Sequence, residues 1–137
     1  MPSKALSACL DANVLISAIA FGGKPNQVLE ALFERQFGNV TCAEIMAETR
    51  RNLLNKVGLA PVRVHTVMDL ILARSTVIEP QGIINAAQHG PDNLVLETAL
   101  LGGCDVLVTG DKRHLLPLNP YKGLIIEPPS AFLKRLY

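Results

Sequence analysis

The segment ALSACLDANVLISA, residues 5–18, places a single acidic side chain between two apolar segments. Residues 6–10 are typical of a short buried strand, and the apolar residues that follow Asp11 are typical of a packed helix. Asp11 therefore lies where a strand runs into a helix. A carboxylate at such a junction can cap the helix, or it can supply half of a metal site. The local sequence permits both roles, so the rest of the chain is needed to choose between them.

Strands and helices alternate along the chain beyond this junction. Apolar spacing and turn residues predict helices over 25–37, 42–56, 61–75 and 92–101 with a last short helix capped by Ser130, and strands over 39–42, 76–79, 105–109 and 123–127. This alternation is the pattern of an α/β fold, a three-layer α/β/α sandwich with a central, mainly parallel sheet. The 137 residues are enough for a single domain over residues 1–137.

The composition restricts the class of protein. Apolar residues make up 49% of the chain and the formal net charge is +1, so we expect a folded protein without a whole-molecule attraction to nucleic acid or anionic lipid. Cys9, Cys42 and Cys104 are widely spaced, which predicts free thiols in a reducing cytoplasm. The segment Leu6-Ser7-Ala8-Cys9 has the form of a lipoprotein cleavage box but lacks a preceding apolar segment, and no stretch is long enough to span a membrane. We therefore expect a cytoplasmic protein.

The two most apolar strands share one feature, because ALSACLD (residues 5–11) and DVLVTGD (residues 105–111) both end in aspartate. Ligands of parallel sheets bind at the carboxyl ends of the strands. If the two strands are neighbours, Asp11 and Asp111 face one crevice, where their charges repel unless a cation lies between them. Ligands that are all oxygen atoms favour Mg²⁺ or Mn²⁺.

Two further acids are candidates for the same crevice. Thr41-Cys42-Ala43-Glu44 matches a capping box, which assigns Glu44 a structural role and leaves Glu48, one turn later, without one. Asp92 follows Gly90-Pro91 at a helix start, where an N-cap and a site residue are equally good interpretations. Glu97 lies roughly 140° around the helix from Asp92, so we do not expect it in the site.

Three segments, DANVLISA, AEIMAETRRNLL and PDNLVLETALLGGCDVLVTGDKRHLLPL, resemble the successive motifs of the PIN-domain family, in the correct order and over nearly the whole chain. The likeness is greatest to the toxin components of bacterial and archaeal toxin–antitoxin systems. It implies an α/β fold with a parallel sheet and the activity of an Mg²⁺- or Mn²⁺-dependent ribonuclease. It places the four family acids at Asp11, Glu48, Asp92 and Asp111, as catalytic residues and metal ligands, with Asn13 and Thr109 as supporting polar groups.

The resemblance also implies partners and contains one departure. It implies an RNA substrate, an antitoxin that occupies the groove of the site, and a homodimer. The family often carries more acids just before its third motif, whereas this chain has Gln88-His89-Gly90-Pro91. This difference weakens a second metal site, and the sequence leaves open whether one or two ions act.

Groups that could hold the substrate are less clearly marked. Arg50, Arg51, Lys112 and Arg113 flank two of the acids, where they can contact phosphate or form a solvated basic surface. The chain has six aromatic residues (Phe and Tyr) and no Trp, so we do not expect base stacking to supply most of the affinity. His89 and His114 lack a matching histidine or cysteine spacing, and we interpret them as surface or supporting groups instead of metal ligands.

Other classes of protein fit the sequence less well. Gly22-Gly23-Lys24 suggests a phosphate loop, but Pro25 stands where that motif requires Ser or Thr. A phosphoacceptor receiver domain needs an aspartate after its third strand, where this chain has Ile78-Glu79-Pro80. The remaining alternative is a PIN fold of weak or absent catalytic activity that serves as an RNA-binding or assembly module.

Overall fold

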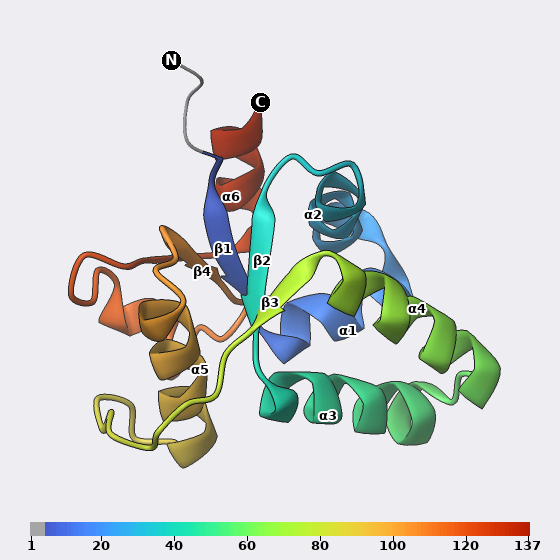
Figure 1. Cartoon of the computed structure of the whole chain (residues 1–137), viewed down its shortest axis with the longest axis horizontal. Helices are drawn as coiled ribbons and strands as arrows, with labels where there is room; N and C mark the ends of the chain where they lie inside the picture. Colours follow the sequence, from blue (N-terminus) through green and yellow to red (C-terminus); the bar gives the residue numbers. More distant parts are fainter. Residues whose placement is uncertain (1–4) are drawn as a thin grey trace.

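Residues 5–137 are described by the computed structural model, which contains a five-stranded sheet in the order β3-β2-β1-β4-β5 (Figure 1). All neighbouring strands are parallel. The strands are β1 (Ser7–Leu10), β2 (Gly38–Thr41), β3 (Ser75–Val77), β4 (Val106–Val108) and β5 (Ile125–Glu127). The predicted parallel α/β sheet is thereby confirmed.

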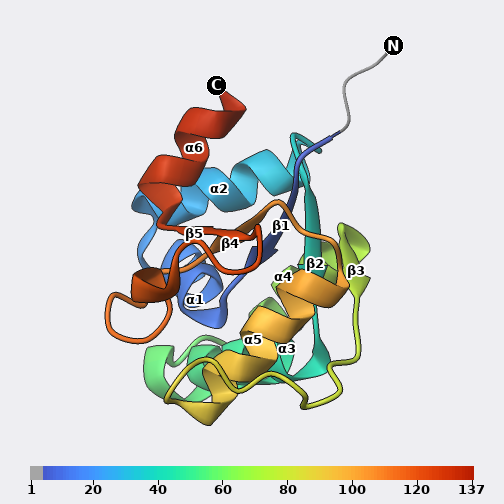
Figure 2. The ribbon, with the colours of Figure 1, turned by 90° about the vertical axis from the view of Figure 1, so that its left-hand side faces the viewer.

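Helices cover both faces of this sheet. They are α1 (Ala12–Phe21), α2 (Gly23–Phe33), α3 (Ala43–Asn52), α4 (Pro61–Ala73), α5 (Gly90–Leu101) and α6 (Pro129–Leu136), and α3 continues as one π-helical turn over Leu53–Val57. Helix α5 packs on one face against β1, β2 and β4, whereas α1 to α4 lie on the other side and α6 packs against α2 (Figures 1 and 2). The three layers expected from the sequence are present.

The two strands that end in aspartate are neighbours at the centre of the sheet. Leu10 of β1 is paired with Val108 of β4, and both strands are buried on their two faces. The backbone N–H of Asp11 continues the ladder by donating to the carbonyl of Val108 at 3.0 Å. Asp11 and Thr109 therefore leave the sheet side by side at its carboxyl edge. The pairing of β1 with β4 therefore places Asp11 beside the turn that carries Asp111.

Two predicted helix caps are wrong. The N-cap of α3 is Cys42, and Thr41 is instead the buried last residue of β2, with a hydroxyl that finds no hydrogen-bond partner within residues 5–137. Thr41 and Glu44 thus form no capping box, because the sheet keeps Thr41 in its last ladder position. The N-cap of α6 is Pro128, which places Ser130 inside the helix.

Close packing and free thiols complete the fold. At the end of α5, a Cβ on Gly102 would lie 2.4 Å from Val40 Cγ1, so only glycine lets this helix approach β2 so closely. Cys9 and Cys42 are buried, Cys104 is partly buried, and all three are free thiols, as predicted. In the described part of the chain, none of the helices has the length and apolar character needed to cross a bilayer.

Candidate active site

A pocket of about 240 Å³ opens at the carboxyl ends of β1 and β4, and all four predicted acids line it: Asp11, Glu48, Asp92 and Asp111. These side chains come from four separate segments, namely the end of β1, helix α3, the first turn of α5 and the turn after β4. The rest of the lining consists of Asn13, Ile16, Asn52, His89, Pro91, Val95 and His114. The fold therefore gathers acids that are up to 100 positions apart in the sequence.

Asp11 caps helix α1 and also lines the acid pocket. It is the N-cap of α1, and its Oδ1 accepts a hydrogen bond from the N–H of Ala12 at 2.7 Å. Its Oδ2 accepts a hydrogen bond from the Thr109 hydroxyl at 2.8 Å and lines the pocket with the other acids. The cap therefore fixes the carboxylate without removing it from the site.

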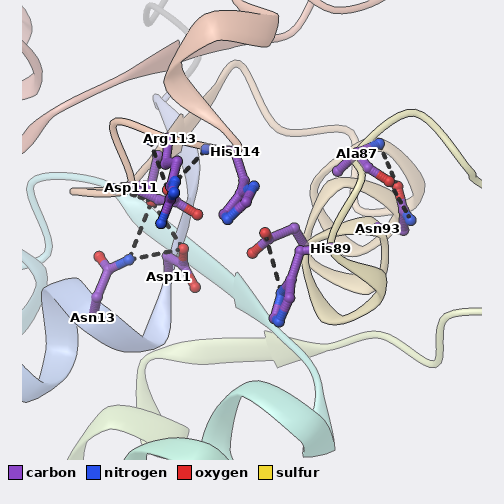
Figure 3. A network of polar contacts seen from close by, with 10 residues as sticks. Asp11, Asn13, Ala87, His89, Asn93, Asp111, Arg113 and His114 are labelled. Atoms are coloured by element: carbon purple, nitrogen blue, oxygen red, sulfur yellow. Dashed lines mark hydrogen bonds and ion pairs between the residues drawn. The ribbon is translucent and has the colours of Figure 1, made fainter.

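Asn13 and Thr109 form the polar support that was predicted for the first and last acids (Figure 3). Asn13 Nδ2 lies 3.2 Å from Asp11 Oδ2 and 3.3 Å from Thr109 Oγ1. Asn13 Oδ1 accepts from the N–H of Gly110, and Thr109 Oγ1 accepts from the N–H of Asp111. One connected network thus ties the start of α1 to the turn that carries Asp111.

The electrostatics of the pocket oppose a full set of negative charges. The pKa of Asp11 is raised to about 6, chiefly by burial and also by the carboxylates of Asp92 and Glu48, against the lowering effect of the Thr109 hydroxyl and the Ala12 N–H. Burial and the neighbouring Asp111 carboxylate likewise raise the pKa of Asp92, against the opposing effect of His89 and His114. The acids are therefore close enough for the charge of one to raise the pKa of another.

Asp92 is not a helix cap, which excludes that interpretation of its position. The N-cap of α5 is His89, and Asp92 lies in the first turn of the helix. Its Oδ2 is buried and, among the residues that the structure describes, receives no well-formed hydrogen bond, although His89 Nδ1 lies 3.3 Å away. A buried carboxylate oxygen without a donor is costly, and it is a natural ligand for a cation.

Asp111 and Glu48 complete the set in different ways. Asp111 Oδ1 accepts hydrogen bonds from the backbone N–H groups of Arg113 and His114, at 3.0 and 2.9 Å, and so also holds its own turn. Glu48 is exposed on α3 at the rim of the pocket. Glu97 stays out of the site, as expected, because its carboxylate accepts from the N–H groups of residues 81–84 instead.

The four predicted phosphate-binding residues are all exposed, and two of them line pockets that border the acid pocket. Arg51 lines a neighbouring pocket of about 420 Å³ between α3 and α5, which shares Glu48 and His89 with the acid pocket. Arg113 lines another of about 260 Å³, which shares His114 with it. Arg50 and Lys112 line neither of these pockets.

Sequence reasoning missed two features of the lining. Asn52 lies one helical turn after Glu48, and its Nδ2 donates to the Glu48 carbonyl, so the spacing alone could have indicated it. His89 and His114 stack with ring centroids 5.5 Å apart and an interplanar angle of 22° (Figure 3). Nothing local in the sequence indicates this pair, because the two rings come from segments 25 positions apart.

The donors in this pocket fit a hard divalent cation in chemistry. Carboxylate oxygens predominate, two of the acids have raised pKa values, and one buried oxygen lacks a donor. As placed, no group of three or more His, Cys, Asp or Glu side chains within residues 5–137 could hold a metal ion. Binding would therefore draw the carboxylates together around the ion, which would offset their repulsion.

Comparison with known proteins agrees with this geometry. One similar solved structure is a chain of VapBC2 from Rickettsia felis bound to a DNA fragment from its promoter, with a TM-score of 0.61, 17% identity, and coverage of 90% of this chain and 98% of that chain. No curated protein matches the chain. The family model described as PIN domain matches residues 7–113. Since this match spans most of the chain, including the segments that carry all four acids, the chain belongs to the PIN domain family.

Proposed function

We propose that this protein is an Mg²⁺- or Mn²⁺-dependent endoribonuclease. The observation that carries the proposal is the gathering of Asp11, Glu48, Asp92 and Asp111 around one pocket at the carboxyl edge of the sheet. Burial, and to a smaller extent repulsion between the carboxylates, raises the pKa values of Asp11 and Asp92, and a bound cation would favour their charged forms. Membership of the PIN family supports nuclease chemistry for such a pocket.

The residues divide the work as follows. Asp11, Asp92 and Asp111, with Glu48 from the rim, would hold the ion, which when bound orients water and stabilises charge on the phosphodiester oxygens. The Thr109 hydroxyl and the Ala12 N–H fix the orientation of Asp11 in advance. Asp92 Oδ2 has no well-formed hydrogen bond from the described residues, so it keeps its acceptor capacity for the ion or for a proton of the attacking water.

Exposed basic side chains supply the contacts to RNA. Arg51 and Arg113 line two different pockets that each border the acid pocket, so a strand bound at the acids could contact either cation. Arg50 and Lys112 are close to them in sequence and would add weaker contacts. These contacts attract phosphate without reading sequence.

We also propose that the protein is the toxin of a toxin–antitoxin pair, acts in the cytoplasm, and forms a homodimer. The support is the family membership, the resemblance of its motifs to toxin components, and a fold similar to a chain of the VapBC2 assembly. The antitoxin would cover the acid pocket and so block the RNA. Co-purification with the product of an adjacent short gene, followed by recovery of RNA cleavage after its removal, would test this part.

The deciding experiment is cleavage of RNA by the purified chain. We expect cleavage in Mg²⁺ or Mn²⁺, none in EDTA, and a loss of two or more orders of magnitude in Asp11→Asn. Asp69→Asn is the matched control, because Asp69 is an exposed carboxylate on α4 outside the pocket. Equal activity in EDTA, or in Asp11→Asn, would contradict the metal-dependent mechanism.

One observation favours a second candidate, a non-catalytic RNA-binding or assembly module. The acids within residues 5–137 are not grouped so that they could hold a metal ion as placed. In that case the chain would bind RNA without cleaving it under any metal condition. The same assay, combined with a binding measurement, separates the two functions.

A further inference from the structure

The stacked imidazoles of His89 and His114 lie at the lining of the acid pocket and have no part in the mechanism so far. His89 Nδ1 is 3.3 Å from Asp92 Oδ2, and the His114 N–H donates to Asp111 Oδ1 at 2.9 Å. The His89 ring thus lies against Asp92, whereas His114 is bonded to Asp111 through its backbone N–H and leaves its ring free of that contact. The two rings are stacked at 22°, so the aromatic surface that remains beside the carboxylates is an outer face of the stack.

The position of the pair between three pockets is the second observation. His89 is shared by the acid pocket and the pocket that contains Arg51, and His114 is shared by the acid pocket and the pocket that contains Arg113. The two rings therefore border both arginine-containing pockets as well as the acid pocket, where a bound polyanionic strand can reach them. The His89 side chain is 57% exposed, so its ring is accessible to such a strand.

Among the described residues that line the acid pocket, His89 and His114 are the two with aromatic rings that could stack on a base. Among the described side chains of the acid pocket, no Phe or Tyr is present, and the other groups are carboxylates, amides and aliphatic residues. A nucleobase next to a cleaved phosphate needs an apolar or aromatic surface to be held in place, and aromatic stacking accepts any base with an unpaired face.

We infer that His89 and His114 form a stacking platform for one unpaired nucleobase of the substrate, beside the phosphate that the acids act on. This inference rests on the proposed ribonuclease function and adds to it that the substrate is single-stranded at the cleaved position. It adds imidazole to the stacking surfaces that the Phe, Tyr and Trp count considers.

The test measures binding, so that it does not depend on cleavage. The probe is a labelled single-stranded RNA 12-mer that carries 2-aminopurine at successive positions, titrated with protein in EDTA and again in Ca²⁺. Stacking on the platform changes the fluorescence of 2-aminopurine at one position, and the dissociation constant comes from anisotropy. The parent is compared with His89→Ala, His114→Ala, His89→Phe and His114→Phe.

We expect each alanine variant to bind the RNA about tenfold more weakly and to lose the position-specific 2-aminopurine signal. The phenylalanine variants keep a ring face and should retain both the affinity and the signal. His65→Ala is the matched control, because His65 is exposed on α4, pairs with Asp69 and lies outside the pocket. Thermal melting of every variant separates lost stacking from lost folding.

Three results would overturn the platform. These are unchanged binding by both alanine variants, equal loss in the phenylalanine variants, and no measurable binding by the parent in either buffer. Failure of the ribonuclease proposal gives a different result. The parent protein would then bind RNA with the 2-aminopurine signal but would not cleave it, which supports the stacking platform and contradicts the ribonuclease function.

Discussion

Asp11 caps helix α1, yet its burial disfavours the charged carboxylate and so lowers the stability of the folded chain at neutral pH. Its hydrogen bonds from Ala12 and Thr109 favour the charged carboxylate, yet burial outweighs them and raises its pKa to about 6. The ordinary value is 3.8, so between the two values the folded chain binds more protons at this residue than the unfolded chain does. The contribution of Asp11 to stability is therefore present at low pH and is lost as the pH rises toward 6.

Replacement of Asp11 by Asn should remove that pH dependence. In EDTA, the free energy of unfolding of Asp11→Asn relative to the parent should rise by on the order of 2–3 kcal/mol between pH 4.5 and pH 7.5. Urea titrations at steps of half a pH unit measure this difference, with Asp69→Asn as the exposed control. A difference between variant and parent that stays constant with pH would contradict the assignment of the raised pKa to Asp11.

Asp111 gives a prediction about metal binding. Asn can keep the hydrogen bonds from the N–H groups of Arg113 and His114 through its own Oδ1, so metal-free Asp111→Asn should melt at the parent temperature or above it. The variant should lose most of the rise in melting temperature that Mn²⁺ gives the parent. Asp111→Ala, which lacks the acceptor, should instead be less stable by about 1–2 kcal/mol without metal. A low-melting Asp111→Asn would show that this carboxylate is chiefly structural.

Glu44 and Glu48 form a natural pair for comparison on α3. Both are exposed, but only Glu48 lines the acid pocket. Glu48→Gln should reduce RNA cleavage by about ten- to a hundredfold without changing the melting temperature, whereas Glu44→Gln should leave cleavage within about twofold. Single-turnover cleavage rates of the two variants provide the measurement. The reverse order of effects would mean that the wrong acid was chosen.

At the scale of elements, α5 organises the loop that leads into it. The Glu97 carboxylate accepts from the N–H groups of residues 81–84, and Asn93 makes two hydrogen bonds with the backbone of Ala87, at 2.7 and 3.1 Å. Burial alone would raise the pKa of Glu97, but these backbone donors lower it overall. The loop is therefore held at two points just before His89 and Asp92, which keeps both residues at the pocket.

Loss of the Glu97 charge should loosen this loop. Glu97→Gln retains only one acceptor oxygen for several N–H groups, so amide hydrogen exchange at residues 81–84 should accelerate by on the order of tenfold. The strands at the centre of the sheet should exchange as in the parent. Glu79→Gln is the control, since Glu79 is exposed and near the same loop. Equal protection in Glu97→Gln and the parent would show that the loop is held by other contacts.

At the scale of the whole molecule, the sequence predicted the sheet and the place of the acids more successfully than the local caps. Strands such as 105–109 are recognisable because both of their faces are buried, and parallel strands bring Asp11 and Asp111 to one edge by geometry alone. The cap at Thr41 failed because the sheet kept that residue in β2. The capping-box motif at Thr41 competes with the pairing of β2 in the sheet, and the strand pairing is favoured.

The features that the sequence could not supply depend on contacts between distant segments. Glu97 finds its partners 13–16 positions away in a loop without periodicity, and His89 meets His114 only after α5 and β4 are in place. Neither contact corresponds to a residue spacing that could be recognised in the sequence. Residues next to a regular element were predictable, whereas residues placed by an irregular loop were not.

The pairing of β1 with β4 has a consequence for how the pocket is made. Asp11 and Glu48 precede the exposed loop residue Asn85, and Asp92 and Asp111 follow it, so a break at Asn85 would leave two carboxylates on each piece. Neither piece alone would carry the complete pocket, because the Asp11–Thr109 contact joins residues 98 positions apart. The protein is thus a candidate for a split reporter, in which two separately made fragments regain a function only when they are brought together. By the same logic, a chain emerging during synthesis lacks the complete pocket until the turn after β4, which carries Asp111, has been made.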